Sequence, residues 1–412
     1  MESTVDAQLL NPSFGEPKIA DVIKNNYCTS CGTCEAVCPM GVVLVDRDEI
    51  DISKDIRNYR KAHLHTEGWL KTHGLSFNDN RYLTCVNCYA CERVCPALDG
   101  FTEDEFDNIM YMKAARSTSL SGQDGAVISQ IASSLLGNGS IDCVFGITRN
   151  DEWKTDVILM TKPVDVEKSA GTKYTYHPIM SYTRHLVGHH EYMPGPLLFD
   201  EQVIEKLKSF EHIALVGTPC QVHGARLLQQ EQVVNISLII GLICMESFSY
   251  EVMSKVIIPE KTGFDMKDII KLNIHKGKFT VSKSDQETQV PLKEIMPYAR
   301  NGCHHCIDYT SYFSDICVGS VGSNDGWNTI IVRTEIGDKY LDQVQGLEYS
   351  DKHINMDILQ KLTDTKHKNN DWDWKGFMKQ KWYDECQLQR KWGPTPSRWG
   401  MEKLEIRNIH IE

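Results

Sequence analysis

The sequence predicts an α+β protein built from three parts in series, and three observations support this. Eight of the fifteen cysteines lie in two short runs near the N-terminus, strand-like and helix-like patterns alternate through the middle, and five of the eight tryptophans follow residue 370. A chain of 412 residues is long enough for two or three domains. We expect a flexible arm at 1–17, a cysteine-rich domain at 18–105, an α/β domain at 110–345 and an irregular C-terminal extension at 346–412.

Composition narrows the class of protein. Charged residues make up 24% of the chain and hydrophobic residues 41%, which is ordinary for a soluble globular protein. The net charge is −12 and no basic run is present, so no nucleic-acid partner is expected. No apolar run approaches the ~20 residues that span a bilayer, so direct membrane insertion is not expected. The N-terminus has no signal pattern, and we expect a cytoplasmic protein that is peripheral to a membrane only through a partner.

The two N-terminal cysteine runs share the pattern C-x2-C-x2-C-x3-C-P, which is typical of bacterial ferredoxins. Three thiolates two residues apart wrap one 4Fe-4S cluster, while the fourth, followed by proline, ligates the other cluster. A pair of zinc sites would instead use separated C-x2-C pairs. The runs therefore predict a bacterial-type two-cluster 4Fe-4S ferredoxin domain, with one cluster on Cys28, Cys31, Cys34 and Cys95 and the second on Cys85, Cys88, Cys91 and Cys38.

The segment between the two runs is longer than the hairpin of a minimal ferredoxin. Its apolar stretches at 42–45 and 50–52 predict the two strands of that hairpin. Residues 53–74 then predict a charged helical insertion. Its histidines are candidate ligands, but histidines on a polar helix are more often solvated; they are His63, His65 and His73.

The middle of the chain alternates helical stretches with short apolar strands, which favours an α/β domain. The helical stretches lie at 125–136 and 202–208, and the strands at 143–147, 213–216 and 238–244. No G-x-G-x-x-G motif follows a strand, which counts against an NAD-binding Rossmann domain.

Four further cysteines form a scattered set. Cys220 and Cys244 lie at the ends of predicted strands, where ligands gather in α/β sheets, and Cys303 and Cys306 enclose two histidines. The set is consistent with a third 4Fe-4S cluster, with zinc, or with a redox disulfide between Cys303 and Cys306. Three others are expected to be buried packing residues, namely Cys143, Cys317 and Cys386.

Two glycine-containing stretches, 169–175 and 319–327, are candidates for binding a phosphate or a flavin ring. Glycine allows the backbone to approach a ligand closely, and Lys173 supplies a charge. Stretches of this composition are also common in ordinary turns.

Several motifs between Tyr111 and about Thr334 carry a family resemblance. They are Ala115-Arg116-Ser117, Gln123-Asp124-Gly125, Ala170-Gly171-Thr172-Lys173-Tyr174-Thr175, Thr218-Pro219-Cys220-Gln221, Cys244-Met245-Glu246, Lys276-Gly277-Lys278-Phe279, Cys303-His304-His305-Cys306, Asp308-Tyr309, Gly319-Ser320-Val321-Gly322, Gly326-Trp327 and Arg333-Thr334. With these motifs the chain resembles the beta subunits of coenzyme F420-reducing hydrogenases and dehydrogenases. The N-terminal cluster domain makes it most similar to the electron-input subunits of F420H2 dehydrogenases, followed by the beta subunits of F420-dependent formate dehydrogenases. Two positions depart from the family pattern, with Ala126 where glycine is common and Cys317 where serine is common.

The resemblance implies an α/β flavin-binding domain that holds FAD and takes coenzyme F420 as its substrate. It also implies a third 4Fe-4S cluster on Cys220, Cys244, Cys303 and Cys306. Such an F420 oxidoreductase transfers a hydride between F420 and FAD and passes single electrons through the clusters, without a catalytic side chain. The expected cofactor contacts are Gln123, Asp124, Gly125, Gly171, Thr172, Lys173, Tyr174, Thr175, Gly322 and Trp327.

The resemblance further implies a redox partner subunit. The candidates are the membrane F420H2 dehydrogenase, a formate dehydrogenase, a hydrogenase and a carbon monoxide dehydrogenase. Two other functions fit the same sequence: a flavin-free electron-relay subunit, and a ferredoxin-dependent reductase of another substrate on the same scaffold. The tryptophan-rich extension lies outside the family pattern and either docks on a partner or folds back over its own domain.

Overall fold

The protein was analysed as a computed structural model, whose described residues are 19–24, 26–45, 49–64, 88–99, 104–186, 199, 201–231, 234–350 and 352–370. Several sequence predictions lie outside these residues. They concern the arm at 1–17, the ligand Cys85, the packing residue Cys386, the histidines at 65 and 73, and the tryptophans after residue 370.

An eight-stranded sheet organises the described structure, in the order β13-β3-β12-β11-β7-β6-β4-β5. Four central strands run parallel, and the others pair antiparallel to them or to each other. The parallel strands are apolar on both faces, as expected for strands covered by helices on both sides. The parallel strands are β4 (Cys143–Arg149), β6 (Ile213–Gly217), β7 (Leu238–Leu242) and β11 (Ile316–Gly319), and the others are β3 (Tyr111–Ser117), β5 (Thr155–Met160), β12 (Asn328–Val332) and β13 (Leu347–Tyr349).

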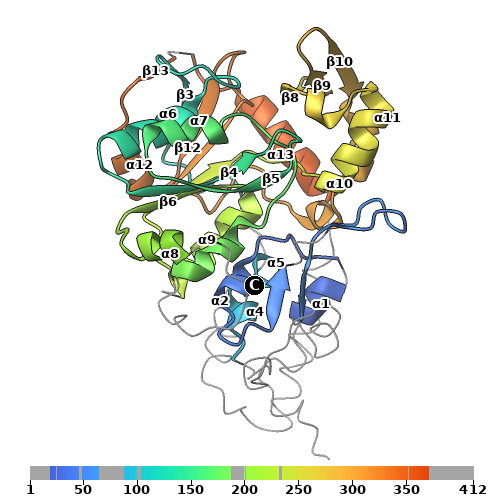
Figure 1. The fold of residues 1–412 in the computed structure, drawn as a ribbon. Helices are drawn as coiled ribbons and strands as arrows, with labels where there is room; N and C mark the ends of the chain where they lie inside the picture. Colours follow the sequence, from blue (N-terminus) through green and yellow to red (C-terminus); the bar gives the residue numbers. More distant parts are fainter. Residues whose placement is uncertain are drawn as a thin grey trace, which may run out of the picture.

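Helices cover both faces of this sheet, as Figure 1 shows. On one face, α6 (Val127–Gly137) packs on a core that includes Val144 and Ile240, together with α7 (Val166–Ser169) and α12 (Glu335–Leu341). On the other, α9 (Pro219–Gln230) and α8 (Glu201–Lys208) pack on a core that includes Phe145. The predicted alternation of strands and helices is therefore confirmed. In the described part of the chain, no helix has the length and apolar composition needed to cross a bilayer.

A smaller antiparallel sheet lies beside the main sheet, at the upper right of Figure 1. Its strands are β8 (Lys271–His275), β9 (Lys278–Ser282) and β10 (Glu287–Pro291). Phe248, Phe264 and Phe279 are in its core. The helices that pack there are α10 (Tyr250–Val252), the π-helix Met253–Ile257 and α11 (Ile258–Thr262).

The cysteine-rich segment lies below the main sheet in Figure 1, next to α9. Its elements are α1 (Ile19–Lys24), α2 (Thr33–Val37), β1 (Val43–Val45), β2 (Ala62–Leu64), α4 (Ala90–Arg93) and α5 (Pro96–Asp99). Val37 and Val94 belong to the same hydrophobic core as Val222 of α9. A Cβ on Gly224 of α9 would lie 2.4 Å from Cγ2 of Thr33, so α2 and α9 pack closely. The cysteine-rich segment and the α/β part thus share a core.

The hairpin of the cysteine-rich segment differs from the prediction. β1 pairs with β2, in the register Val43↔Leu64, and residues 50–52 form no strand. Residues 53–61 form no helix either. The reason is local: Asp51 accepts hydrogen bonds from the backbone and side chain of Ser53, and Asp55 accepts one from the backbone of Arg57. Such side-chain bonds compete with helix formation. His63 lies in β2 rather than on a helix.

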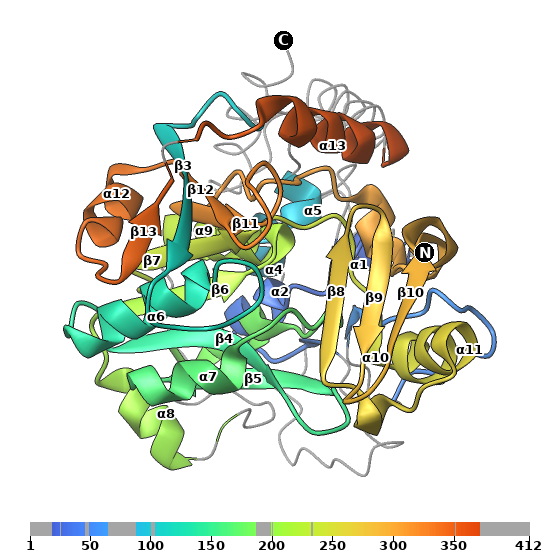
Figure 2. The same ribbon diagram turned by 90° about the horizontal axis from the view of Figure 1, so that it is seen from above.

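The C-terminal extension is not irregular where the structure describes it. β13 (Leu347–Tyr349) pairs with β3 and forms an edge of the main sheet. After it comes α13 (Met356–Asn369), which crosses the top of Figure 2. The side chain of Asn355 caps this helix by accepting a hydrogen bond from the backbone of Ile358, and Leu359 is fully buried. Residues 346–370 therefore belong structurally to the α/β part.

Candidate functional site

The predicted ligands and glycine loops meet at one edge of the main sheet. Cys220 follows β6, Cys244 follows β7, and the loop 319–327 follows β11. β3 is antiparallel to β12, which is antiparallel to β11, so the loop 118–126 after β3 leaves from the same edge. The carboxyl ends of parallel strands are where α/β proteins bind ligands. The sheet topology thus brings both kinds of predicted site together.

The four scattered cysteines form one group. Burial raises the pKa of the Cys244 thiol, and the charges of Cys303, Cys220 and Cys306 raise it further. Burial likewise raises the pKa of Cys306 to about 12. None of these four thiols forms a disulfide bond. The described residues contain no group of three or more His, Cys, Asp or Glu side chains placed to hold a single metal ion. A four-iron cube is larger than one ion, so its thiolates stand farther apart around it.

Polar side chains reach the sulfur atoms of this group. The hydroxyl of Tyr176 lies 3.5 Å from Sγ of Cys220, and Oγ of Ser247 lies 3.5 Å from Sγ of Cys303. Nη2 of Arg300 donates a hydrogen bond of 3.4 Å to the same sulfur. Hydrogen bonds to cysteine sulfur tune the reduction potential of an iron–sulfur cluster. The donor set is therefore chemically suited to such a cluster.

Arg300 connects this group to the N-terminal cysteines. Its side chain is buried, and Nη1 donates to the backbone carbonyl of Thr29 at 3.1 Å and to Oγ of Ser30 at 3.4 Å. Its guanidinium also stacks 3.7 Å from the ring centre of Tyr176. Burial opposes the charge of Arg300, but the negative charge of Cys303 and its neighbours raises the pKa of the guanidinium. One cation thus contacts both cysteine groups.

The first predicted N-terminal set also lies together. Burial raises the pKa of the Cys34 thiol well above its usual value, and the charges of Cys31, Cys28 and Cys95 add to this shift. Burial also raises the pKa of the Cys31 thiol to about 11, with a contribution from Cys220 of the other group. The two groups are therefore close enough to interact electrostatically. Of the second set, the structure describes Cys38, which is buried, Cys91, which is half-buried, and Cys88, which is exposed.

The predicted cofactor loops are joined by hydrogen bonds. The side chain of Gln123 accepts from the backbone of Thr172 at 3.0 Å and donates to the side chain of Asn273 at 2.7 Å. The hydroxyl of Tyr174 accepts from the backbone of Ile274 at 2.8 Å. These bonds bring the loop after β3, the 170–175 loop and β8 together.

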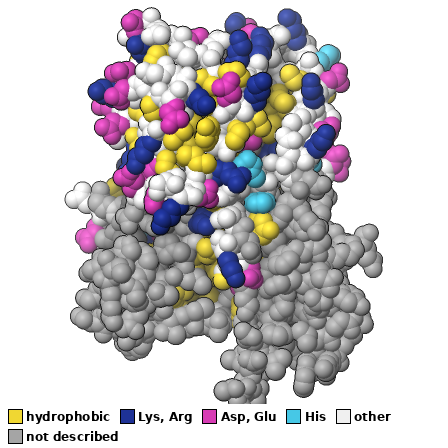
Figure 3. Space-filling view, turned by 90° about the vertical axis from the view of Figure 1, so that its right-hand side faces the viewer, with side chains coloured by type: hydrophobic (Ala, Val, Ile, Leu, Met, Phe, Trp, Pro, Cys, Tyr) yellow, Lys and Arg dark blue, Asp and Glu magenta, His cyan; other side chains and the backbone are white. Residues whose placement is uncertain are grey.

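On the face with β8–β10, Figure 3 shows hydrophobic side chains gathered among charged ones.

Two of the predicted glycines have different roles. The backbone of Gly125 donates to Oδ1 of Asn328 at 2.9 Å, and a Cβ on Gly125 would lie 2.8 Å from the carbonyl oxygen of Ala115. Gly125 is therefore needed where β3 and β12 meet. A Cβ on Gly171 would meet nothing within 4 Å, and its φ is +81°. Gly171 leaves open space beside the backbone. Ala126, where the family has glycine, also has a left-handed φ, of +52°.

Lys173 and Thr175 place buried polar groups next to this space. Nζ of Lys173 donates to the carbonyl oxygens of Ser169 and Ala170, and only 9% of the residue is exposed. Burial, followed by the nearby charge of Arg149, lowers the pKa of Lys173 to about 7. Oγ1 of Thr175 is buried and has no hydrogen-bond partner among the described residues. A buried amine with a lowered pKa and an unpaired hydroxyl fit an anionic, hydrogen-bonding ligand.

Gly322 and Trp327 lie at the loop after β11, but Gly322 does not face open space. Its φ is +91°, and a Cβ there would lie 2.9 Å from Cγ2 of Ile354 and 3.0 Å from Cδ1 of Leu359. Gly322 therefore allows this loop to pack against α13 and the residues before it. The ring of Trp327 lies 4.7 Å from the guanidinium of Arg116, at the end of β3.

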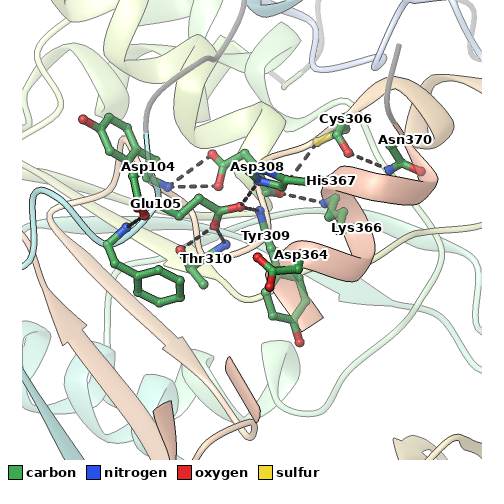
Figure 4. Close-up of polar contacts among 12 residues, drawn as sticks. Asp104, Glu105, Cys306, Asp308, Tyr309, Thr310, Asp364, Lys366, His367 and Asn370 are labelled. Carbon is green, nitrogen blue, oxygen red and sulfur yellow. Dashed lines mark hydrogen bonds and ion pairs between the residues drawn. The ribbon is translucent and has the colours of Figure 1, made fainter. Parts of the chain in front are cut away.

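Sequence reasoning missed Arg300 and three residues of α13 or its C-terminus, Lys366, His367 and Asn370. Figure 4 shows these three beside Cys306 and Asp308. No sequence motif marks these residues, because their partners are backbone carbonyls, sulfur or, for His367, a carboxylate far away in the sequence. One signal was available: Lys366 and Asn370 follow Leu359 and Thr363 on a single helical face, so polar residues occupy the apolar side.

Three family models match the chain. The model "Coenzyme F420 hydrogenase/dehydrogenase, beta subunit N-term" matches residues 110–184, and its C-terminus counterpart matches residues 210–352. A 4Fe-4S dicluster domain matches residues 27–99.

Curated relatives and a solved structure are also similar. The chain is 43% identical to a subunit of the F(420)H(2) dehydrogenase of Methanosarcina mazei, over 86% of this chain and 93% of that protein. It is 27% identical to the coenzyme F420-dependent sulfite reductase of Methanocaldococcus jannaschii, over 86% of this chain but only 51% of that protein. A chain of the F420-reducing [NiFe] hydrogenase complex from Methanosarcina barkeri matches with a TM-score of 0.57 and 25% identity, over 66% of this chain and 93% of that chain.

Proposed function

Because the chain belongs to the coenzyme F420 hydrogenase/dehydrogenase beta-subunit family, we propose that it transfers a hydride between F420 and FAD and passes single electrons through three 4Fe-4S clusters. The coarser function is that of an F420-dependent oxidoreductase with a 4Fe-4S dicluster domain. The observation that carries the finer proposal is the convergence of the third cysteine group and the glycine loops at one edge of the sheet.

The third cluster is assigned to Cys220, Cys244, Cys303 and Cys306. Their thiols lie within electrostatic reach of one another, and hydroxyl and guanidinium groups approach two of the sulfur atoms. Burial would keep water away from the cluster and strengthen these interactions. The two remaining clusters are assigned to the eight cysteines of the dicluster domain, as the spacing predicts.

The FAD site is assigned to the loops that Gln123 joins. Gly171 leaves space beside the backbone, Lys173 offers a buried amine and Thr175 an unpaired hydroxyl. When bound, FAD would exchange a hydride with F420 and single electrons with the clusters, which links a two-electron carrier to one-electron carriers. The task of these residues is to bind and orient the cofactor and to exclude water; no side chain needs to act as a nucleophile.

The path to a partner runs through the contact between the two parts of the chain. Arg300 hydrogen bonds to Cys303 and to the loop of Cys28–Cys34, and the charge of Cys220 contributes to the raised pKa of the Cys31 thiol. Electrons passing between FAD and the dicluster domain would cross here. Beyond it we propose a redox partner subunit, since the relative in Methanosarcina mazei is named as a subunit of F(420)H(2) dehydrogenase.

Cofactor analysis of the anaerobically purified chain tests this proposal. We expect about twelve iron atoms per chain, as three four-iron clusters require, together with one FAD. The Cys244→Ala variant should lose about four of these irons and keep its FAD. An iron content of about eight in the unmodified chain would exclude the third cluster. Reduction of a dye by reduced F420, but not by NADH, should accompany the flavin.

A second candidate function is an F420-dependent reductase of another substrate on this scaffold. It is favoured by the similarity to the coenzyme F420-dependent sulfite reductase, although this chain spans about half of that protein. Reduction of sulfite by the purified chain with reduced F420, without any partner subunit, would support this alternative. A flavin-free relay would instead show cluster absorbance without a flavin spectrum.

A further inference from the structure

A buried lysine of α13 lies beside Asp308, close to Cys306 of the third cysteine group, as Figure 4 shows. Lys366 is 1% exposed, and its Nζ donates one hydrogen bond of 2.7 Å to the carbonyl oxygen of Cys244 and another of 2.7 Å to that of Asp308. Cys244 follows β7, whereas Asp308 lies two residues after Cys306. One ammonium therefore ties together the two chain segments that supply three of the four cysteines.

The residue one helical turn later acts on the same segments. Nδ2 of Asn370 donates to the carbonyl oxygen of Cys303 at 2.9 Å and to that of Cys306 at 2.7 Å. Asn370 caps the C-terminus of α13 and lies on the same side as Lys366, which is four residues before it. Together they bind the backbone carbonyls of Cys244, Cys303 and Cys306.

A third contact fixes the helix to the loop that follows Cys306. Nε2 of His367 lies 2.9 Å from Oε1 of Glu105. The Glu105 carboxylate is buried and accepts hydrogen bonds from the backbone of Tyr309 at 2.9 Å and of Thr310 at 2.5 Å. Glu105 thus joins the residues that follow Cys306 to α13 in one hydrogen-bonded network.

The Lys366 ammonium also places a positive charge beside the thiols. Its two carbonyl acceptors, each 2.7 Å from Nζ, direct their negative ends at the ammonium and compensate for its burial. A positive charge inside a low-dielectric site stabilises an added electron more strongly than it would in water. This effect acts on the reduced form of a cluster held there.

We propose that α13 is a clamp for the third cluster, in which Lys366 and Asn370 position its cysteines and Lys366 raises its reduction potential. The proposal rests on the proposed function, because it requires that Cys220, Cys244, Cys303 and Cys306 hold a cluster. It goes beyond the family match, which ends at residue 352, before α13 begins. Both residues are positioning residues rather than catalytic ones.

Potentiometric titration of the anaerobic holoprotein, followed by electron paramagnetic resonance, tests the clamp. The signal of the third cluster is identified by its loss in Cys244→Ala. In Lys366→Met we expect reduction of this cluster to become at least tenfold less favourable, which is a shift of about 59 mV to lower potential for a one-electron couple. Lys366→Arg should restore most of the potential. The control Lys368→Met removes an exposed charge of the same helix and should leave the potential unchanged.

Asn370→Ala provides a test that does not depend on Lys366. This variant keeps the charge of Lys366. When a chelator is added, it should lose the signal of the third cluster at least tenfold faster than Lys368→Met does. If Lys366→Met leaves the reduction potential unchanged, the charge of Lys366 does not raise it. If Asn370→Ala and Lys368→Met lose the cluster signal at equal rates, α13 is not a clamp. If the unmodified chain holds only the iron of two clusters, the proposed function fails instead, so the two failures are distinguishable.

Discussion

Arg300 is a buried cation, and its contribution to the stability of the protein depends on its hydrogen-bond partners. Removing one partner from a buried, hydrogen-bonded charge network costs about 3 kcal/mol or more, because groups are left buried without partners. Arg300 hydrogen bonds to Thr29, Ser30, Ser247 and Cys303. Its loss therefore affects both parts of the chain.

We predict that Arg300→Met lowers the stability of the holoprotein by about 3 kcal/mol. The control Arg116→Met removes a pair with Glu348 that is about half exposed on both sides and should cost less than about 1 kcal/mol. The measurement is the thermal unfolding midpoint under anaerobic conditions. Equal shifts in the two variants would show that Arg300 does not hold the parts together.

Lys173 predicts a pH dependence of FAD binding. With its pKa near 7 in the free protein, Lys173 is mostly neutral at pH 9 and must take up a proton to meet an anionic group. The affinity of the flavin-depleted protein for FAD should therefore be highest at or below pH 7 and fall between pH 7 and 9, at most about tenfold per pH unit. Flavin fluorescence titrations measure this. Lys173→Met should remove the slope, while Lys168→Met, which changes an exposed lysine, should keep it; a slope that persists in Lys173→Met would contradict the assignment.

At the scale of elements, Gly32 shows how the first cysteine loop is seated against the α/β part. Gly32 caps α2 with a φ of +97°, and a Cβ there would lie 2.3 Å from Oγ and 2.4 Å from the backbone nitrogen of Ser181. Ser181 belongs to the 3-10 helix Ile179–Leu186, whose Met180 donates a backbone hydrogen bond to Cys31 at 3.1 Å. Only glycine fits both the backbone angle and the space.

Gly32→Ala should therefore destabilise the protein by about 3 kcal/mol, from left-handed strain and overpacking together. Gly139→Ala is a matched control, because Gly139 has a φ of +74° but open space around it. It should cost only the strain, about 1 kcal/mol. Comparison of the thermal unfolding midpoints separates the cost of backbone strain from the cost of overpacking. Similar losses of stability in both variants would mean that the contact with Ser181 is not tight.

The elements differ in how well the sequence predicts them. β4, β6 and β7 were predictable because their buried faces make continuous apolar runs. β2 was missed because three residues, Ala62–Leu64, carry too little pattern. α13 was missed because Lys366 and Asn370 stand on its buried face, where the expected residues are apolar. Their partners are backbone carbonyls, which leave no trace in the sequence.

The residues of the candidate site also differ in how well the sequence predicts them. The cysteine spacing grouped Cys28, Cys31 and Cys34, which are close in sequence, and the ferredoxin pattern added Cys95 from the other run. The structure brings these four thiols together. The sequence also grouped Cys220, Cys244, Cys303 and Cys306, but it left a cluster, zinc and a disulfide open. The choice of a cluster needed the family resemblance, because these residues are distant in sequence and only the fold brings them together. Gly322 resembled a cofactor-loop glycine but packs against Leu359 instead.

At the scale of the molecule, the shared core determines how the parts work together. Val37 and Val94 pack with Val222, so the cysteine-rich segment is held against the α/β part rather than tethered to it. This arrangement keeps the Cys31 and Cys220 groups at a constant separation. A fixed separation suits stepwise electron transfer between cofactors on the two parts, because no docking step is required.

Hydride transfer from F420 to FAD is tested most directly by a stopped-flow experiment in which the anaerobic, FAD-loaded chain is mixed with reduced F420. We expect the flavin absorbance to bleach first and the broad cluster absorbance to fall afterwards. Arg300→Met should slow the second phase more than the first, since Arg300 lies between the two cysteine groups. Absence of bleaching while FAD is demonstrably bound, or cluster reduction that precedes bleaching, would contradict hydride transfer from F420 to FAD as the first step.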